Sequence, residues 1–440
     1  MICQFCASED IFKISMEYYF WWDKGYDEYK VIQPTLEKDI SCKFLVVGGG
    51  ISGLHAALEL TNQGVKNIVL IEKWECGRGT TGASTGFLMP GEEAMLTDLL
   101  EHYGKVDGQY LWNFVQRGVD LMASTAKENQ LDVDLREQPN VSIATSQTQS
   151  KTIQEEHKAL TEAGFQPEKW DQTQIASHLG TTLVQSATMY GNTYGINPLK
   201  YAHALKLLLI QKGVKIFENT VLESISQTEA IANTKKITFE HAIVAINKPS
   251  PTLSSVGDKV AGAQSSAVVS EVLNQEQITS LFPDGQSYMV WDTAEFYLYF
   301  RLTADNRIIM GKDNILTLLS PTASQNTIPA NAAINNFKKL FPQLLSLEFP
   351  YYWSEIIDGT YDLIPLIKTE GNIVSSGGNV GLPWASNIGA LSALVCLGKT
   401  EIPAIFSVSR VPSTLHFQNK YLRMAEYSLY FGLAELKRKS

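Results

Sequence analysis

The chain has 440 residues, of which 44% are hydrophobic and 19% charged, and its formal net charge is −10. This length predicts two or three domains, and the composition is that of an ordinary globular, soluble protein. The negative charge argues against a nucleic-acid partner, because a phosphate backbone is bound by clustered lysines and arginines.

The five cysteines are odd in number and widely spread, which does not fit a disulfide framework and favours a reducing, cytoplasmic location. Cys3 and Cys6 form a lone C-x-x-C without a second half, and the histidines show no metal spacing, so no metal site is predicted. The longest apolar run, residues 388–397, is shorter than the roughly 20 residues that span a bilayer. We therefore expect no transmembrane segment.

The chain begins with a segment rich in aromatic side chains, residues 1–38, that we interpret as an N-terminal extension. An apolar strand over 44–47, a helix over about 51–63 and a strand over 67–71 follow. This βαβ order implies a parallel sheet.

The rest of the chain alternates between two patterns. Apolar spacing predicts helices over 108–131 and 197–213, a strand pair over 214–225, a strand over 237–247, alternating antiparallel strands over 262–317, a last parallel strand over 372–381 and a helix from about Asn387. The C-terminal stretch from Ser413 is expected to be one long helix that could dock on its own domain, on a second subunit or on a membrane surface, and its mixed charge favours packing on protein. Its candidate contacts are Tyr421, Met424, Tyr427, Leu429 and Leu433.

Three glycines, Gly48, Gly50 and Gly53, fit G-x-G-x-x-G at the junction of the first strand and helix. The first allows a tight turn, the second a close approach of a pyrophosphate to backbone N–H groups, and the third close packing of the helix on the strand. Glu72 ends the second strand, where a carboxylate can accept hydrogen bonds from ribose hydroxyls. The pattern predicts a binding site for an adenine dinucleotide.

The loop after Glu72, "KWECGRGTTGASTGFLMPG", favours FAD over NAD(P) as that dinucleotide. Its small residues suit a backbone that lies against a flat ring system, which a nicotinamide fold does not require. An NAD(P)-linked dehydrogenase remains the alternative.

These motifs together resemble the D-amino acid oxidase/glycine oxidase-like (DAO) family of FAD-dependent amine oxidoreductases. The matching stretches occur in the family's order from about residue 40 to 400, and they include "VVGGGISGLHAALEL", "GRGTTGAST", "GTYDLIP" and "NIVSSGGNVG". The aromatic extension looks like that of the γ-glutamylputrescine oxidase-like branch.

The resemblance implies an α/β (α+β) fold, in which a Rossmann-like FAD-binding domain with a parallel sheet is interrupted by a substrate domain built on a mostly antiparallel sheet. The expected division is an extension over 1–38, an FAD-binding domain over 39–125, 190–260 and 350–405, a substrate domain over 126–189 and 261–349, and a C-terminal helical segment over 406–440. In this family the flavin oxidises the C–N bond of an amine or amino acid to an imine, and the electrons pass to oxygen or another acceptor.

The resemblance also implies the residues that hold FAD. The pyrophosphate would lie at Gly48, Gly50, Ile51, Ser52 and Gly53, the adenosine ribose at Glu72 and Lys73, and adenine at the backbone of Val221. The ribityl chain and ring would lie along Thr80, Thr81, Ala83 and Ser84, with Gly378, Asn379 and Gly381 at the pyrimidine edge. On structural grounds alone, Val221 could instead be a core strand residue, and the last two glycines could only cap a helix.

The substrate side departs from the glycine oxidase-like pattern. Those members bind the substrate carboxylate with an arginine in "W-x-G-L-R-P-x-T-x-D", and Ile357 falls at that position of "WSEIIDGTYD". Arg301 is the replacement candidate, with Tyr299 as a second substrate-orienting residue, although Arg301 could also face outward from its strand. Without such a cation, the substrate lacks an α-carboxylate or the protein is a non-catalytic flavoprotein. No single catalytic residue is predicted, and covalent attachment of flavin to His55 is not expected.

Overall fold

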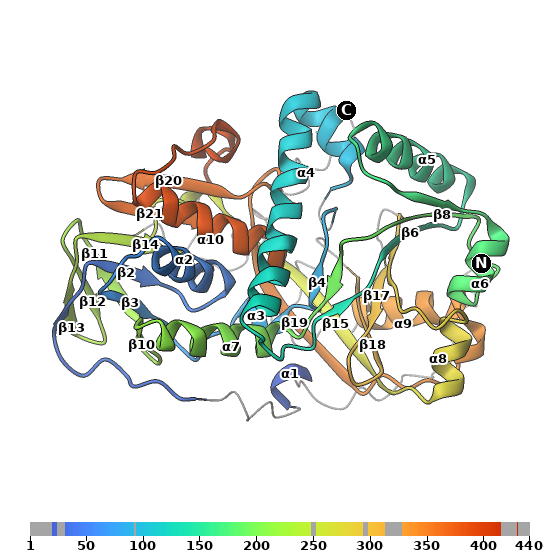
Figure 1. Cartoon of the computed structure of the whole chain (residues 1–440), viewed down its shortest axis with the longest axis horizontal. Helices are drawn as coiled ribbons and strands as arrows, with labels where there is room; N and C mark the ends of the chain where they lie inside the picture. Colours follow the sequence, from blue (N-terminus) through green and yellow to red (C-terminus); the bar gives the residue numbers. More distant parts are fainter. Residues whose placement is uncertain are drawn as a thin grey trace, which may run out of the picture.

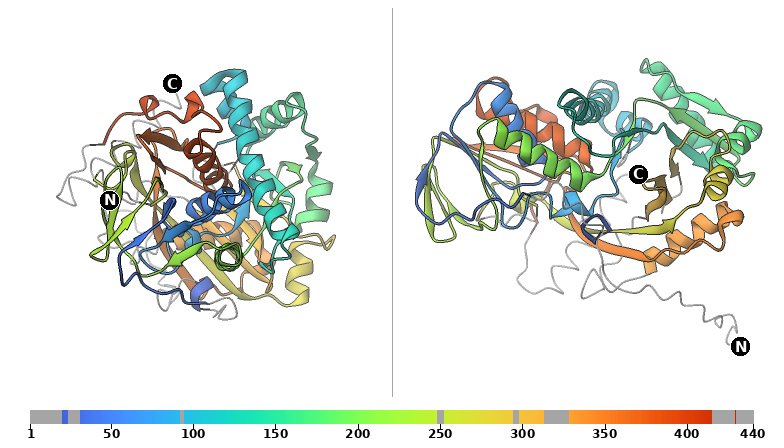
Figure 2. Two further views of the ribbon diagram at one scale, coloured as in Figure 1. Left: turned by 60° about the vertical axis from the view of Figure 1, so that its left-hand side comes forward. Right: turned by 60° about the horizontal axis from the view of Figure 1, so that its bottom comes forward.

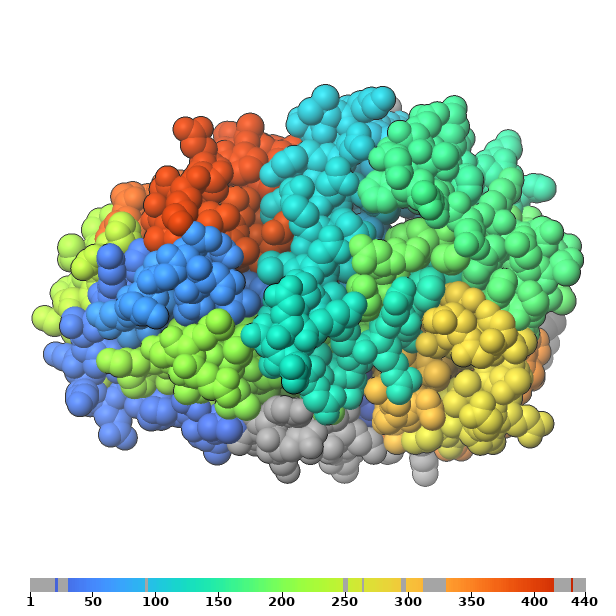
Figure 3. Space-filling model, in the orientation of Figure 1, coloured from blue at the N-terminus to red at the C-terminus, as the bar shows by residue number. Residues whose placement is uncertain are grey.

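A computed structural model describes residues 20–23, 31–91, 94–247, 252–293, 298–312, 328–414 and 429. Two sheets lie on opposite sides of a long helix, α4 (Leu96–Glu128), and Figures 1 and 3 show this helix running down the middle of one face. Cys3, Cys6 and most of the predicted C-terminal helix lie outside the described residues. Among the described residues, no helix is both long and apolar enough to cross a membrane.

The first sheet has six strands and carries the predicted βαβ unit. Its strands, in spatial order, are β10 (Lys215–Phe217), β3 (Ile68–Ile71), β2 (Phe44–Val47), β14 (His241–Val244), β21 (Ile373–Gly377) and β20 (Leu366–Glu370). All neighbours are parallel except β20 and β21. Fully buried runs such as "FLVV" are typical of parallel strands that are covered on both faces.

Helices cover one face of this sheet and a small sheet covers the other. Alternate residues of β2 point to two separate cores: Phe44 and Val46 pack with the helices, and Leu45 and Val47 pack with the small sheet. The helices are α2 (Ile51–Asn62), α7 (Pro198–Gln211) and α10 (Leu382–Cys396), and the small sheet holds β1 (Ile40–Ser41), β13 (Lys235–Thr238), β12 (Glu229–Ala232) and β11 (Leu222–Ile225). Figure 2 shows the helices together on one side of the strands.

The second sheet has eight strands and is antiparallel except for the β6–β16 pair. In spatial order they are β19 (Tyr351–Gly359), β15 (Ala261–Val272), β18 (Arg307–Lys312), β17 (Leu298–Leu302), β16 (Met289–Asp292), β6 (Asn140–Ala144), β8 (Ser186–Tyr190) and β7 (Glu168–Trp170). A hydrophobic core under this sheet includes Phe300 and Phe337. The predicted combination of a parallel and a mostly antiparallel sheet is confirmed.

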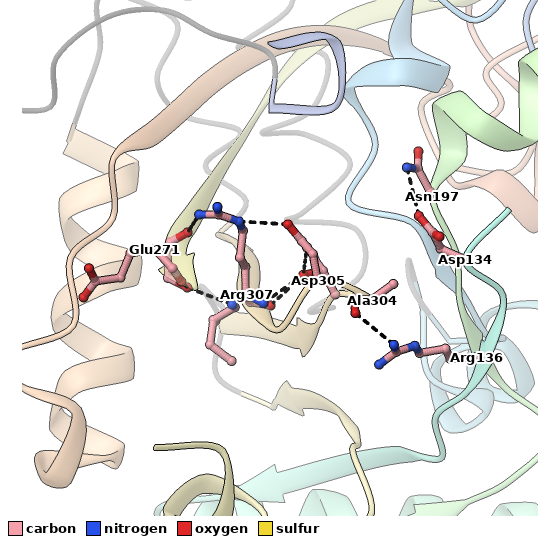
Figure 4. A network of polar contacts seen from close by, with 10 residues as sticks. Asp134, Arg136, Asn197, Glu271, Ala304, Asp305 and Arg307 are labelled. Atoms are coloured by element: carbon pink, nitrogen blue, oxygen red, sulfur yellow. Dashed lines mark hydrogen bonds and ion pairs between the residues drawn. The ribbon is translucent and has the colours of Figure 1, made fainter. Parts of the chain in front are cut away.

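The remaining described elements connect these layers. They are α1 (Phe20–Asp23), α3 (Thr80–Ala83), α5 (Gln147–Glu162), α6 (Gln172–Leu179), α8 (Gln275–Leu281), α9 (Ile328–Leu340), the short strands β4 (Phe87–Leu88), β5 (Arg136–Glu137) and β9 (Tyr194–Gly195), and 3-10 turns at Gly257–Lys259, Pro342–Leu344, Ala404–Phe406 and Val408–Arg410. Polar contacts close the β17–β18 hairpin: Figure 4 shows Arg307 bonded to Asp305, and Arg136 donating to the Ala304 carbonyl.

Three predicted boundaries were wrong. The helix expected from residue 108 begins at Leu96 and continues past a kink at Gly104, where φ is +73°. The helix expected from Asn387 begins at Leu382, because a proline at its first turn is compatible with a helix start. The single strand expected over 237–247 is two strands, β13 and β14, that belong to different sheets.

Candidate active site

The turn between β2 and α2 has no room for side chains at two of its glycines. Gly48 has a φ of +112°, and a Cβ there would lie 2.3 Å from the Ala245 carbonyl oxygen. A Cβ on Gly53 would lie 1.9 Å from the Gly48 carbonyl oxygen, so this glycine lets α2 pack directly on the turn. These contacts support the roles that the sequence assigned to the first and third glycines.

The N-terminus of α2 is open toward a cavity. Its N-cap is Gly50, which supplies no side-chain cap, and the first turn contains no acidic residue. The positive end of the helix dipole and the first-turn N–H groups are therefore suited to an anion such as a pyrophosphate.

Glu72 stands beside this corner at the end of β3. Its Oε2 accepts a hydrogen bond from the Gly49 N–H at 2.7 Å, and its Oε1 accepts one from the Trp74 N–H at 3.0 Å. Burial raises the pKa of this carboxyl, and the two N–H donors oppose that rise. The carboxylate is thus held in place at the wall of the cavity.

A cavity of about 340 Å³ extends from this corner. Of the predicted cofactor residues, those that line it are Gly48, Gly50, Ile51, Ser52, Glu72, Lys73, Thr80, Thr81, Val221, Gly378 and Asn379. Val221 has an exposed side chain and is not a core residue. The cavity brings together segments that lie more than three hundred residues apart in the chain.

A second cavity of about 140 Å³ shares part of its wall with the first. The shared residues are Ile51, Thr80, Thr81, Glu355, Asn379 and Ala385. Three further predicted residues, Ala83, Ser84 and Gly381, line the second cavity. Gly53 is the only predicted cofactor residue that lines neither, which fits its packing role beneath the turn.

The segment over residues 77–85 lines the two cavities, and side-chain donors bind three consecutive carbonyls at its end. The indole N–H of Trp353 donates to the Ala83 carbonyl at 2.8 Å, and that of Trp21 donates to the Ser84 carbonyl at 2.9 Å. Arg301 donates to the Thr85 carbonyl through Nε at 2.9 Å and Nη2 at 2.7 Å. The loop is therefore anchored from α1, β17 and β19 together.

The prediction that Arg301 orients the substrate is not supported by its position. Its side chain is 3% exposed and lines neither cavity, and Nη2 also donates to the Ile196 carbonyl at 2.6 Å. The guanidinium extends along the sheet to the backbone of the loop instead of into the pocket. The alternative of an outward-facing arginine does not fit this burial.

A buried ion pair binds the backbone just before this segment, at Cys76. Lys206 Nζ lies 2.9 Å from Glu218 Oε1, and neither side chain is more than 2% exposed. The Glu218 carboxylate also accepts from the N–H groups of Cys76 at 2.7 Å and Gln33 at 2.9 Å. Burial alone would raise the pKa of Glu218, but these donors and the Lys206 ammonium lower it.

The second cavity has an aromatic and weakly polar wall on the side of the eight-stranded sheet. Tyr299 lines it as predicted, while its strand neighbours Leu298 and Phe300 point into the core. The rings of Trp291 and Tyr299 stack with their centroids 5.0 Å apart, and the Phe87 ring meets the Tyr299 ring edge-on with centroids 5.3 Å apart.

Sequence reasoning missed several residues of this wall, namely Phe87, Trp291, Trp353 and Glu355. Trp353, Glu355 and Ile357 alternate along β19 and all line the cavity, so one face of this strand forms part of its wall. The signal was present in the stretch that contained Ile357, because residues two apart on a strand share a face.

The described residues fit FAD by two features besides the glycine corner. Asn379 lines both cavities; its Nδ2 donates to Ser52 Oγ at 3.1 Å, and its Oδ1 is buried without a hydrogen-bond partner. A buried acceptor without a donor is unfavourable unless a bound molecule supplies one. The two cavities also share lining residues and differ in wall character, which suits a dinucleotide with a ring system.

His55 is buried within α2 and lines neither cavity. Its Nε2 lies 3.0 Å from the Tyr201 hydroxyl, and burial lowers its pKa to about 3. This position supports the expectation that His55 carries no flavin. The part of the chain that the structure describes contains no group of three or more His, Cys, Asp or Glu side chains that could hold a metal ion.

Comparison with known proteins gives a consistent result. Residues 43–393 match the family described as DAO, FAD dependent oxidoreductase. The chain is 25% identical over 393 residues to the probable oxidoreductase OrdL of Haemophilus influenzae. This alignment covers 86% of this chain and 88% of that protein. It is 26% identical over 334 residues to the gamma-glutamylputrescine oxidoreductase of Escherichia coli, covering 73% and 74% respectively.

Among solved structures, glycine oxidase from Geobacillus kaustophilus superimposes with a TM-score of 0.70 at 17% identity. The match covers 84% of this chain and 99% of that one. This likeness shows that the fold is shared.

Proposed function

Because the chain belongs to the DAO family of FAD-dependent oxidoreductases, we propose that it oxidises the C–N bond of an amine or amino acid to an imine. FAD is the cofactor of the family, so the NAD(P)-linked alternative is set aside. The gamma-glutamylputrescine oxidoreductase of Escherichia coli supports an amine substrate for this chain as well.

The observation that carries the proposal is the junction of the two cavities. The first cavity, at the glycine corner, suits the dinucleotide, and the second begins where Thr80, Thr81 and Asn379 line both. A substrate in the second cavity would therefore contact the ring end of the cofactor. When bound, FAD would supply the acceptor for the hydride that leaves the carbon of the C–N bond, and the nitrogen would release a proton as the imine forms.

The protein's own residues would bind and orient the reactants. The first-turn N–H groups of α2 would bind the pyrophosphate, and the Glu72 carboxylate would accept from the ribose. Phe87, Trp291 and Tyr299 would exclude water from one side of the substrate. Orientation over the ring supplies the catalysis, so the site needs no strong base.

The same proposal keeps the division into an FAD-binding domain over 39–125, 190–260 and 350–405 and a substrate domain over 126–189 and 261–349. The six-stranded sheet and the eight-stranded sheet support this division except at β19 (Tyr351–Gly359), which falls in the FAD-binding range but pairs with β15 of the eight-stranded sheet. Oxygen or another acceptor would reoxidise the flavin.

The test is anaerobic reduction of the bound flavin by a panel of amines and amino acids. The loss of the flavin's visible absorption band measures the reduction. We expect at least one member of the panel to reduce the flavin, and air or an artificial acceptor to restore the band. If dithionite reduces the flavin but no member of the panel does, the chain is a non-catalytic flavoprotein and the proposal fails.

A further inference from the structure

The aromatic residues of the N-terminal extension are buried beside the cofactor site. Phe20 and Trp21 of α1 are 0% and 2% exposed. They pack in one hydrophobic cluster with Leu199 of α7 and with side chains of β15, β18 and β19. Figure 1 shows α1 at the lower edge of the molecule, below α3 and β19. The cluster therefore joins a helix of the six-stranded layer to three strands of the eight-stranded sheet.

The same extension contacts the segment that lines the two cavities near both of its ends. At one end, the Trp21 indole N–H donates to the Ser84 carbonyl at 2.9 Å. At the other end, the Gln33 N–H donates to Glu218 Oε2 at 2.9 Å, and Glu218 Oε1 accepts from the Cys76 N–H at 2.7 Å. One buried carboxylate thus connects the backbone of the extension to the start of the segment.

The segment depends on such contacts because its own backbone has wide conformational freedom. Gly77 and Gly86, at its two ends, have φ values of +82° and +77°. A glycine backbone can adopt many conformations, so contacts from outside must select the one that lines the cavities. The extension also packs directly on the middle of the segment, since a Cβ on Gly82 would lie 2.9 Å from Trp22 Nε1.

From these contacts we propose that residues 20–23 and 31–36 form a strap that holds this segment in its FAD-binding conformation, with Trp21 as a positioning residue. The inference goes beyond the proposed function, because it concerns how FAD is held and not which amine is oxidised. A ligand that binds only one of several conformations has an apparent affinity reduced by the fraction of that conformation. Loss of the strap should therefore weaken the binding of the flavin half of FAD, which Thr80, Thr81, Ala83 and Ser84 are expected to contact.

The test compares two ligands on the apoprotein of the full chain. Trp21→Phe removes the indole donor and keeps most of the aromatic surface. ADP carries the adenosine and the pyrophosphate of FAD but lacks the flavin half. We expect Trp21→Phe to raise the Kd of FAD about tenfold and to change the Kd of ADP by less than about twofold, both measured by titration calorimetry.

Trp170→Phe is the matched control. Trp170 is also 2% exposed, it lines neither cavity, and its Nε1 is buried without a hydrogen-bond partner among the described residues. Both Kd values should stay at the wild-type level in this variant. Phe20→Leu is a second test variant, because it loosens the packing of α1 without removing a hydrogen bond from Trp21. It should also raise the Kd of FAD and leave that of ADP unchanged.

The visible circular dichroism of the holoprotein at saturating FAD reports the surroundings of the flavin ring. We expect its band shape to change in Trp21→Phe and not in Trp170→Phe, whereas a mere loss of stability would leave it unchanged. Equal losses of FAD and ADP affinity in Trp21→Phe, or no loss of either, would overturn the inference. The proposed function fails separately: if no amine or amino acid reduces the flavin, the expected split between FAD and ADP still supports the strap.

Discussion

Replacing Arg301 by methionine separates two roles for this residue, a loop anchor and a substrate cation. The change keeps most of the volume but removes the donors to the Thr85, Ile196 and Leu302 carbonyls. Hydrogen bonds to a charged group contribute about 1.5–3 kcal/mol each, and a buried carbonyl left without a donor costs about 1–3 kcal/mol. Because these contributions are not additive, we expect Arg301→Met to lower the free energy of unfolding by about 3–5 kcal/mol.

The same change should weaken the binding of FAD, since Thr85 directly follows Ala83 and Ser84, two of the residues expected to lie along the ribityl chain and ring. We expect the Kd of FAD to rise by about tenfold or more, which corresponds to about 1.4 kcal/mol. Arg301→Lys should recover little, because a single ammonium cannot replace the planar fork that donates to three carbonyls. Urea unfolding of the apoprotein and titration of FAD by fluorescence quenching measure the two quantities.

The control is Arg136→Met. Arg136 is exposed and donates a hydrogen bond at 2.9 Å to the Ala304 carbonyl in the β17–β18 turn, and the loss of such a bond costs only about 0.5–1.5 kcal/mol. This variant, at the hairpin shown in Figure 4, should keep wild-type FAD binding. If Arg301→Met instead retained stability and FAD affinity but raised the KM of carboxylate-bearing substrates alone, the anchoring role would be refuted.

Two further predictions concern α2. Gly53→Ala should weaken FAD binding by about tenfold or more, measured by the same titration, because its Cβ would lie 1.9 Å from the Gly48 carbonyl oxygen. Gly191→Ala, where a Cβ meets nothing within 4 Å, should not, and equal affinity in both variants would contradict the packing argument. Burial lowers the pKa of His55 to about 3, so the unfolded chain binds a proton below about pH 6.5 that the folded chain does not. Stability should therefore fall by up to about 1.4 kcal/mol per pH unit on acidification below that pH, and urea unfolding of His55→Phe should show a shallower slope than the wild type.

The cofactor corner could be predicted from the sequence because its requirements are local. Gly48 has a φ of +112°, and a Cβ on Gly53 would meet the Gly48 carbonyl oxygen of the same turn, so both requirements arise within a few residues. Glu72 ends the adjacent parallel strand, so its position follows from the βαβ unit. Such constraints appear in any single sequence as residue types at fixed spacing.

The hydrogen-bond partners of Arg301 could not be predicted in the same way. Its strand alternates as expected, and Tyr299 on the same face does reach the cavity. The carbonyl of Thr85, however, is 216 residues away in the chain, and no pattern in the sequence records that a loop passes the end of this strand. The donors from Trp21 and Trp353 to the same loop were missed for the same reason.

Under the proposed function, the two halves of the site would recognise their ligands in different ways. The cofactor half depends on the absence of side chains at the turn and on fixed backbone groups, so many substitutions would abolish it. The substrate half depends on side chains at alternate positions of β19, where a change such as arginine to isoleucine leaves the strand and its pairing with β15 intact. A resemblance in the first half therefore indicates the cofactor, but it does not determine the charge of the substrate. For this chain, Ile357 stands on β19 where an arginine would bind a carboxylate, so we expect an amine whose neighbouring carbon bears no carboxylate.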